Sequence, residues 1–371
     1  MEFSVSKADL VRELSLAQGV VEKKTTIPIL SNVLMETAGD RVQLTATDLE
    51  LGIRCSFPAR VSKEGAGTVP VRRLLDYARL LPDVDLTVKF LENHWASLVC
   101  GRSRTRIAGI SRESFPELPE MPAPLAEVPA SVLALMIGKT IFAISSEDSR
   151  FTLNGSLLLL KPDGMVMVST DGHRLAHVES AVEIPGITGD YRALLPKKAM
   201  TEILKLAGEA GDDAVVKFAG DENHLFFQLG SRLLISRKLT GTFPDYERVL
   251  PKDQRNSVTL CREEVRAAIE RVAQFADERS HAIRLQISPG EVKVFSSISD
   301  TGESEEVIPA EYDGAAMEIG FNAQYLLEFM RAVQEKFVTF SFKDPHSAAE
   351  VRPVGGDESY RYRYIVMPMR I

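Results

Sequence analysis

The segment Ser169-Thr170-Asp171-Gly172-His173-Arg174-Leu175, near the middle of the chain, decides how the rest of the sequence is interpreted. Val166–Val168, just before it, is apolar and predicts a strand. Asp171-Gly172 is a dipeptide typical of the tight turn that ends such a strand. We therefore expect His173 and Arg174 at the tip of the turn and Leu175 directed back toward apolar neighbours.

The neighbouring His173 and Asp171 raise the question of a catalytic or metal site. Asp171 and Gly172 are also the residues that build tight turns, and a histidine beside them can be hydrogen-bonded locally. No second His, Cys or carboxylate lies at ligand spacing from His173. The sequence therefore favours a structural turn, and we predict neither catalytic residues nor a metal site.

The surroundings of this segment recur along the chain. Thr47-Asp48 precedes Thr170-Asp171 by roughly 120 residues, a period much longer than that of solenoid repeats. Each of three copies predicts two helices and about eight short strands, which makes an α+β domain with helices packed on one face of its sheets. The predicted helices begin after Ser6, at Arg72-Arg73 and at Lys197, and span Ala130–Ala143, Arg262–Ala276 and Ala323–Gln334.

Two stretches separate the copies. Ser111–Pro129 contains five prolines and Gly241–Asn256 contains Phe243-Pro244-Asp245-Tyr246, so both are expected to be extended linkers. The predicted domains are residues 1–122 (N-terminal), 128–250 (central) and 257–371 (C-terminal).

Bulk properties exclude several classes of protein. The chain has 371 residues, is 44% hydrophobic and 26% charged, and carries a net charge of −8, which argues against a surface that is basic all over. No apolar run reaches membrane-spanning length and the first residues do not resemble a signal peptide, so we expect a cytoplasmic protein. Three isolated cysteines argue against disulfides and zinc, and no cofactor motif is present.

Three motifs in this order and spacing resemble one family. They are Thr170–Leu175, Phe243-Pro244-Asp245-Tyr246 and Val366-Met367-Pro368-Met369-Arg370, and the chain resembles the bacterial DNA sliding clamps, the β subunit of DNA polymerase III. The resemblance implies three repeated clamp domains and a head-to-tail homodimeric ring with inner helices and outer sheets. It also implies a non-catalytic processivity factor that encircles double-stranded DNA without reading sequence, which an acidic chain can do because the retention is topological.

The resemblance further implies a groove for short peptides from partner proteins. The expected partners are the DNA polymerase III catalytic subunit, a clamp loader subunit, other DNA polymerases, and mismatch repair and ligase proteins. Adaptable methionines suit such a groove, Gly172 permits close backbone approach, and Arg174 and Arg370 could meet acidic or polar peptide groups. The matching positions are Leu153, Thr170, Gly172, His173, Arg174, Leu175, Pro244, Arg248, Val249, Ile365, Val366, Met367, Pro368, Met369 and Arg370.

DNA contacts and a dimer interface follow from the same resemblance. The positions expected to approach DNA are Lys24, Arg72, Arg150, Lys197 and Lys198, although the acidic Glu147 and Asp148 precede Arg150. In the dimer, arginines alternating on one edge strand are expected to face an acidic run of the partner protomer. The interface positions are Arg102, Arg104, Arg106, Ile107, Gln274, Phe275, Glu303, Glu305 and Glu306.

Two alternatives stay open at this point. One is an enzyme that uses His173 with Asp171, against which stands the lack of a P-loop, a dinucleotide fingerprint, a nucleophile elbow and a metal-ligand cluster. The other is a paralogue with the clamp fold and altered partners.

Overall fold

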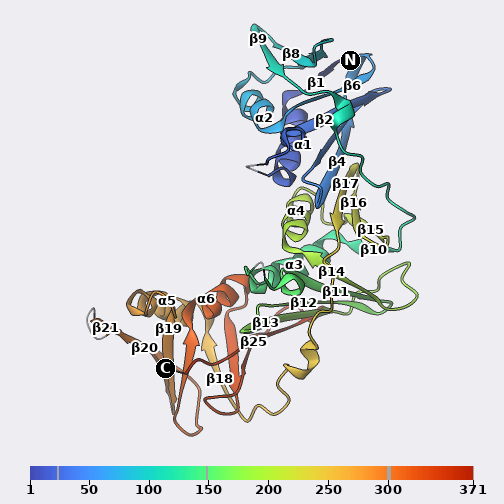
Figure 1. Ribbon diagram of the computed structural model, residues 1–371. Coiled ribbons are helices and arrows are strands. Elements are labelled where there is room, and N and C mark those ends of the chain that lie inside the picture. The colour runs from blue at the N-terminus through green and yellow to red at the C-terminus, as the bar shows by residue number, and fades with distance from the viewer. Residues whose placement is uncertain (23–24, 148, 299–301, 371) are drawn as a thin grey trace. The chain divides into compact units, whose positions relative to one another are not determined.

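The computed structural model describes residues 1–22, 25–147, 149–298 and 302–370 (Figure 1). The chain forms two compact units, each made of two segments. Unit 1 comprises Met1–Ala134 and Lys198–Lys238, and unit 2 comprises Leu135–Lys197 and Leu239–Ile371. The central repeat is therefore divided between the two units.

Unit 1 contains two antiparallel sheets. The five-stranded sheet has the order β5-β1-β7-β8-β9, and the eight-stranded sheet has the order β10-β15-β16-β17-β4-β3-β2-β6. The strands are β1 (Glu2–Val5), β2 (Asn32–Ala38), β3 (Arg41–Thr47), β4 (Leu51–Pro58), β5 (Arg60–Lys63), β6 (Gly65–Pro70), β7 (Leu86–Phe90), β8 (Trp95–Cys100), β9 (Ser103–Ala108), β10 (Ala126–Pro129), β15 (Val215–Gly220), β16 (His224–Leu229) and β17 (Arg232–Arg237).

The helices of unit 1 begin where the sequence predicts. Helix α1 (Lys7–Val20) is capped by Ser6, whose hydroxyl oxygen accepts a hydrogen bond from the Asp9 backbone at 3.1 Å. Helix α2 (Val71–Leu80) follows β6 directly. Helices α3 (Ala130–Thr140) and α4 (Lys197–Gly208) contribute residues to both units.

The first linker is only partly extended chain. Arg112–Ser114 forms a 3₁₀ turn, and the end of the segment forms β10, which pairs with β15 through Ala126 and Phe218. The prediction of an extended linker over the whole of Ser111–Pro129 was therefore wrong at its end. The strand ends at Pro129 and lies at the edge of the sheet, where a proline is tolerated.

Unit 2 also contains two antiparallel sheets. The eight-stranded sheet has the order β14-β11-β12-β13-β25-β24-β23-β18, and the four-stranded sheet has the order β21-β20-β19-β22. The strands are β11 (Gly155–Lys161), β12 (Gly164–Thr170), β13 (Arg174–Ser180), β14 (Tyr191–Pro196), β18 (Asn256–Cys261), β19 (Ala282–Ser288), β20 (Glu291–Ile298), β21 (Gly302–Pro309), β22 (Met317–Asn322), β23 (Phe337–Phe342), β24 (Ala349–Val354) and β25 (Tyr360–Val366).

Helices α5 (Arg262–Val272) and α6 (Ala323–Ala332) start where expected and end slightly earlier than predicted. Aromatic side chains fill the space between α6 and the larger sheet. The Phe329 and Tyr364 rings are stacked, with their centroids 4.9 Å apart. The Tyr364 hydroxyl donates a hydrogen bond to the Tyr325 carbonyl at 2.9 Å. Among the described residues, no helix is both long and apolar enough to cross a membrane.

Candidate functional site

The turn at Asp171–His173 is built as the sequence predicts. The Asp171 carboxylate accepts backbone hydrogen bonds from His173 at 2.9 Å and Arg174 at 3.1 Å, and Thr170 accepts one from Gly172 at 3.1 Å. Gly172 has φ +91°, which glycine adopts without steric cost. The Asp171 carboxylate is thus used by the turn itself, and the described part of the chain contains no metal-binding cluster of His, Cys, Asp and Glu.

Arg174 is buried beneath this turn. Its guanidinium donates to Asp171 at 3.0 Å, to the Phe142 carbonyl at 2.7 Å and to Glu328 on α6. The group also lies 4.4 Å from the centre of the Tyr325 ring. Contact of Arg174 with acidic or polar peptide groups stays a prediction, and its guanidinium already has these partners inside the fold.

An apolar cavity of about 140 Å³ opens beside the turn. Its floor belongs to a buried cluster that includes Leu175, Ile365 and Phe243. Met367, which is 45% exposed, stands at its edge and donates its backbone N–H to the His173 carbonyl at 2.9 Å. The C-terminal strand β25 and the hairpin turn thus form one continuous wall.

Most of the predicted groove positions meet at this cavity. Those lining it are Leu153, Thr170, Gly172, His173, Arg174, Leu175, Pro244, Val249, Ile365 and Met367. Tyr246 also lines it and was missed, although it belongs to the Phe243-Pro244-Asp245-Tyr246 motif and its aromatic side chain could have indicated a wall.

Five predicted positions do not line the cavity: Arg248, Val366, Pro368, Met369 and Arg370. Val366 is fully buried, and the Met369 backbone binds the Gly320 carbonyl at 2.8 Å. Arg248 is exposed and pairs with Asp245 at 2.7 Å.

Two of the positions predicted to contact DNA, Lys198 and Arg150, form ion pairs within the chain. Lys198 binds the Asp48 carboxylate and donates to the Val20 carbonyl at 2.7 Å, so its ammonium ties α4 to the N-terminal repeat. Arg150 pairs with Glu147 at 2.9 Å and donates to the Asp171 carbonyl at 2.6 Å. Arg72 is exposed on α2.

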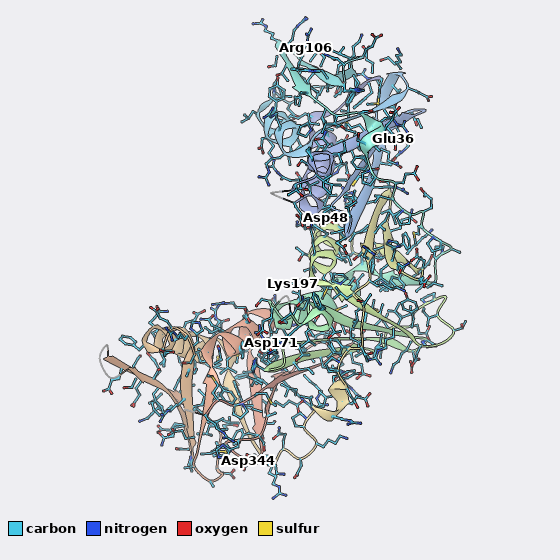
Figure 2. The ribbon with its side chains drawn as sticks, viewed as in Figure 1. Glu36, Asp48, Arg106, Asp171, Lys197 and Asp344 are labelled. Atoms are coloured by element: carbon cyan, nitrogen blue, oxygen red, sulfur yellow. The ribbon has the colours of Figure 1, made fainter. Side chains whose placement is uncertain are left out.

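Lys197 is exposed at the first position of α4 (Figure 2). Lys24 and Asp148 lie outside the described residues.

Six of the nine predicted interface residues lie on two edge strands, one in each unit, and Arg102, Gln274 and Phe275 lie outside these strands. In unit 1, β9 is an edge strand on which Arg104 and Arg106 are exposed and Ile107 is buried. Arg102 precedes β9 and lies in a turn, so the expectation that it alternates with the other two arginines on one strand was wrong.

In unit 2, β21 is an edge strand that carries Glu303, Glu305 and Glu306. Glu305 pairs with Lys293 at 3.1 Å and Glu306 with Arg271 at 2.7 Å, so only Glu303 has no ion pair to another described side chain. Phe275 is 38% exposed, and the exposed Gln274 donates to the Glu270 carbonyl at 3.3 Å.

Comparisons with known proteins match one family along nearly the whole chain. Three family models match: DNA polymerase III beta subunit, N-terminal domain (residues 1–119), central domain (127–245) and C-terminal domain (247–370). A beta sliding clamp of Pseudomonas aeruginosa is 35% identical over 377 residues, and one of Chlamydia muridarum is 31% identical over 373 residues. The first match covers 100% of both chains, and the second covers 100% of this chain and 99% of the relative.

Solved structures of sliding clamps are also similar to this chain. A sliding clamp of Pseudomonas aeruginosa bound to griselimycin has a TM-score of 0.93 at 34% identity, with 100% of each chain covered. A beta sliding clamp of C. crescentus has a TM-score of 0.92 at 32% identity, covering 100% of this chain and 99% of the other.

Proposed function

Because the chain belongs to the DNA polymerase III beta subunit family, the sliding clamps, we propose that its peptide-binding groove is the apolar cavity between the Asp171–His173 turn and Met367. A sliding clamp is a non-catalytic processivity factor that encircles duplex DNA and tethers the replicative polymerase. Other replication and repair proteins dock through the same kind of groove. A member of this family is expected to have a peptide-binding groove. The geometry of this cavity supports its assignment as that groove.

The physical properties of the cavity suit a short peptide. Leu175 and Ile365 provide an apolar floor, while Gly172 has no side chain to keep a peptide backbone at a distance. Met367 is flexible and exposed, so it can adjust to different side chains. We infer that partners insert one or two apolar residues here. The apolar lining of the cavity is the observation that carries this assignment.

Truncation of Met367 tests this proposal. Met367→Ala should weaken binding of a fluorescent peptide from the polymerase III catalytic subunit about tenfold, because about 1.5 kcal/mol of apolar contact is lost. Met317→Ala on β22 is the matched control, since Met317 does not line the cavity. Fluorescence anisotropy measures affinity, and sedimentation verifies that the oligomer is intact. Unchanged peptide affinity in Met367→Ala would contradict the assignment.

We propose that the other docked partners are a clamp loader subunit, other DNA polymerases, and mismatch repair and ligase proteins, and that the protein works in the cytoplasm. The domains proposed are residues 1–122, 128–250 and 257–371. Arg72 and Lys197 are exposed on the second helices of their repeats, which supports phosphate contact by them. Arg150 and Lys198 are weaker candidates because acidic side chains already neutralise them.

The ring is proposed to close as a homodimer by pairing β9 of one protomer with β21 of the other. Both are edge strands with unpaired backbone groups, and such edges are usually covered. Arg104 and Arg106 carry charge opposite to Glu303. Glu305 and Glu306 already form ion pairs within their own chain. Of the three predicted glutamates, we therefore propose that Glu303 faces the two arginines.

A further inference from the structure

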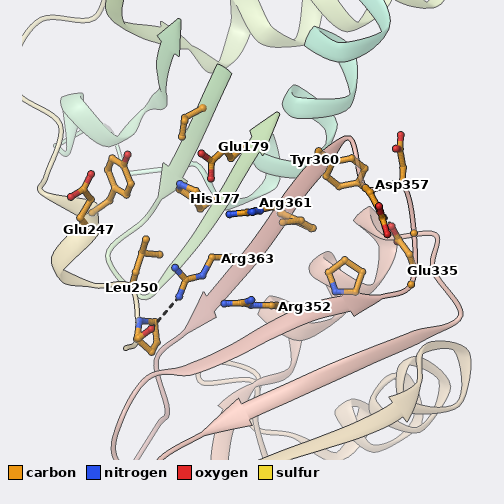
Figure 3. A pocket seen from close by; sticks show the side chains of 18 of the residues that line it. His177, Glu179, Glu247, Leu250, Glu335, Arg352, Asp357, Tyr360, Arg361 and Arg363 are labelled. Atoms are coloured by element: carbon orange, nitrogen blue, oxygen red, sulfur yellow. Dashed lines mark hydrogen bonds between the residues drawn. The ribbon is translucent and has the colours of Figure 1, made fainter. Parts of the chain in front are cut away.

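A second and larger hollow, of about 850 Å³, lies on the same sheet of unit 2 as the apolar cavity (Figure 3). The two sites follow the paired strands β13 and β25. Leu175 and Ile365 form one cross-strand pair under the apolar cavity, and Glu179 and Arg361 form another in the hollow. His177 and Arg363 are the pair between them, on the same face because side chains alternate along a strand.

The segment that follows Phe243 separates the two sites. The Tyr246 ring lies 5.5 Å from the ring of His177, and the Pro251 carbonyl accepts a hydrogen bond from Arg363 at 3.1 Å. Tyr246 lines both the apolar cavity and the hollow. The hollow is therefore adjacent to the proposed groove, with one tyrosine as the shared wall.

The floor of the hollow carries a group of arginines. Arg363 binds the Glu350 carboxylate through two bonds of 2.7 and 3.0 Å, and Arg352 binds the same carboxylate. Burial by itself raises the pKa of Glu350, but the hydrogen bonds from Arg363 and Arg352 outweigh it, so the pKa lies below its ordinary value. Glu350 is ionised at neutral pH and supplies one negative charge for two guanidinium groups.

Arg361 adds a third guanidinium to this floor. It is exposed and forms no ion pair with any other side chain that the structure describes. Figure 3 shows Arg352, Arg361 and Arg363 together beneath the wall formed by His177 and Glu179. The three guanidinium groups share one directly bonded carboxylate, Glu350, because Glu179, the cross-strand neighbour of Arg361, forms no ion pair with it in the described part of the chain.

His177 supplies a second, independent sign of a missing partner. Its ring is 7% exposed, and its Nδ1 atom has no hydrogen-bond partner within the described structure. Buried polar atoms without a partner are rare, and they commonly indicate a bound water or ligand. His177 lines the hollow, and its Nδ1 atom is buried behind that surface.

Acidic side chains around the hollow restrict what can enter. Glu179, Glu247, Asp357 and Glu358 are exposed and line it. They would repel a chain of repeated phosphates such as a nucleic acid.

We propose that the hollow is a binding site for one compact oxyanion, a carboxylate or phosphate group, held by Arg361 and by the guanidinium edges of Arg352 and Arg363 that Glu350 leaves free. The group comes either from an acidic side chain of a polypeptide or from free phosphate. The proposal does not depend on the apolar cavity being the peptide groove.

Thermal unfolding of the full-length protein at constant ionic strength tests the proposal. The two probes are inorganic phosphate and N-acetyl-Glu-Glu-amide, with chloride as the reference anion. A saturating probe should raise the melting temperature by on the order of 2 °C. Arg361→Glu should abolish the rise, while Lys217→Glu, an exposed change of the same charge on β15, should retain it.

The response identifies the source of the anion. A rise with the dipeptide alone assigns the site to a polypeptide carboxylate, and a rise with phosphate alone assigns it to free phosphate. A crystal soaked in selenate should show an anomalous selenium peak between Arg361 and Arg352. No rise with either probe, or a rise that persists in Arg361→Glu, would overturn the proposal. If phosphate does raise the melting temperature, no selenium peak there would also overturn it.

Discussion

Replacement of Lys198 separates a structural role from a DNA contact. The Asp48 carboxylate accepts backbone hydrogen bonds from Glu50 at 2.9 Å and Leu51 at 2.7 Å, and its other oxygen binds Lys198. The Asp48 side chain is 6% exposed, whereas that of Lys198 is 39% exposed. Lys198→Met therefore leaves a nearly buried carboxylate without its cation.

The expected cost lies between two limits. Breaking a fully buried ion pair by removing one partner costs about 3–5 kcal/mol, and an exposed pair contributes at most about 1 kcal/mol. Because water can reach the Lys198 end and the two backbone hydrogen bonds remain, we expect Lys198→Met to lower the free energy of unfolding by about 2 kcal/mol. Lys197→Met, at the neighbouring exposed position, should change it by less than about 0.5 kcal/mol.

Urea unfolding measures this difference through the first transition, since a chain of three domains need not unfold in one step. The double variant Asp48→Asn with Lys198→Met should cost less than the sum of the single changes, because the two side chains interact directly. Retention on circular DNA should fall in Lys197→Met more than in Lys198→Met. A Lys198→Met protein of unchanged stability with impaired DNA retention would refute the structural role.

Three further outcomes are expected. Arg104→Glu with Arg106→Glu should give a monomer of 41.0 kDa in sedimentation, and a persisting dimer would remove both residues from the interface. Burial lowers the pKa of His177 to about 4. Below about pH 6.5 the unfolded chain therefore binds a proton at this histidine and the folded chain does not. The free energy of unfolding should fall as the pH is lowered from 6.5 to 4. Urea midpoints at pH 7.5 and 5.0 measure that loss, and His177→Phe should be less sensitive to pH. Arg174→Met should weaken peptide binding through the displaced turn, and Glu328→Gln should do so less; equal peptide affinity to the unmodified protein would show that the turn holds without Arg174.

Local patterns predicted the local structure well. The Asp171-Gly172 turn, the Ser6 cap and the starts of the helices depend on neighbouring residues, and all are confirmed. The family resemblance, which rests on motif order along the chain, is also confirmed by the comparisons.

Long-range pairings could not be predicted from those patterns. Arg174 binds Glu328, 154 residues away, and Lys198 binds Asp48, 150 residues away. Which lysine on a helix binds a carboxylate of another repeat depends on how strands from two repeats align. For the same reason the sequence did not predict the ion pairs of Arg174 and Lys198, whereas it placed Gly172 and Leu175 in the segment that lines the cavity.

Strand pairing across the repeats has a consequence for limited proteolysis. Sheet hydrogen bonds join β17 to β4 in unit 1 and β13 to β25 in unit 2, so each eight-stranded sheet takes strands from two repeats. A protease that cuts either proline-containing linker would leave these ladders intact. The nicked fragments should therefore co-migrate until denatured, and the central repeat expressed alone would expose two adhesive strand edges.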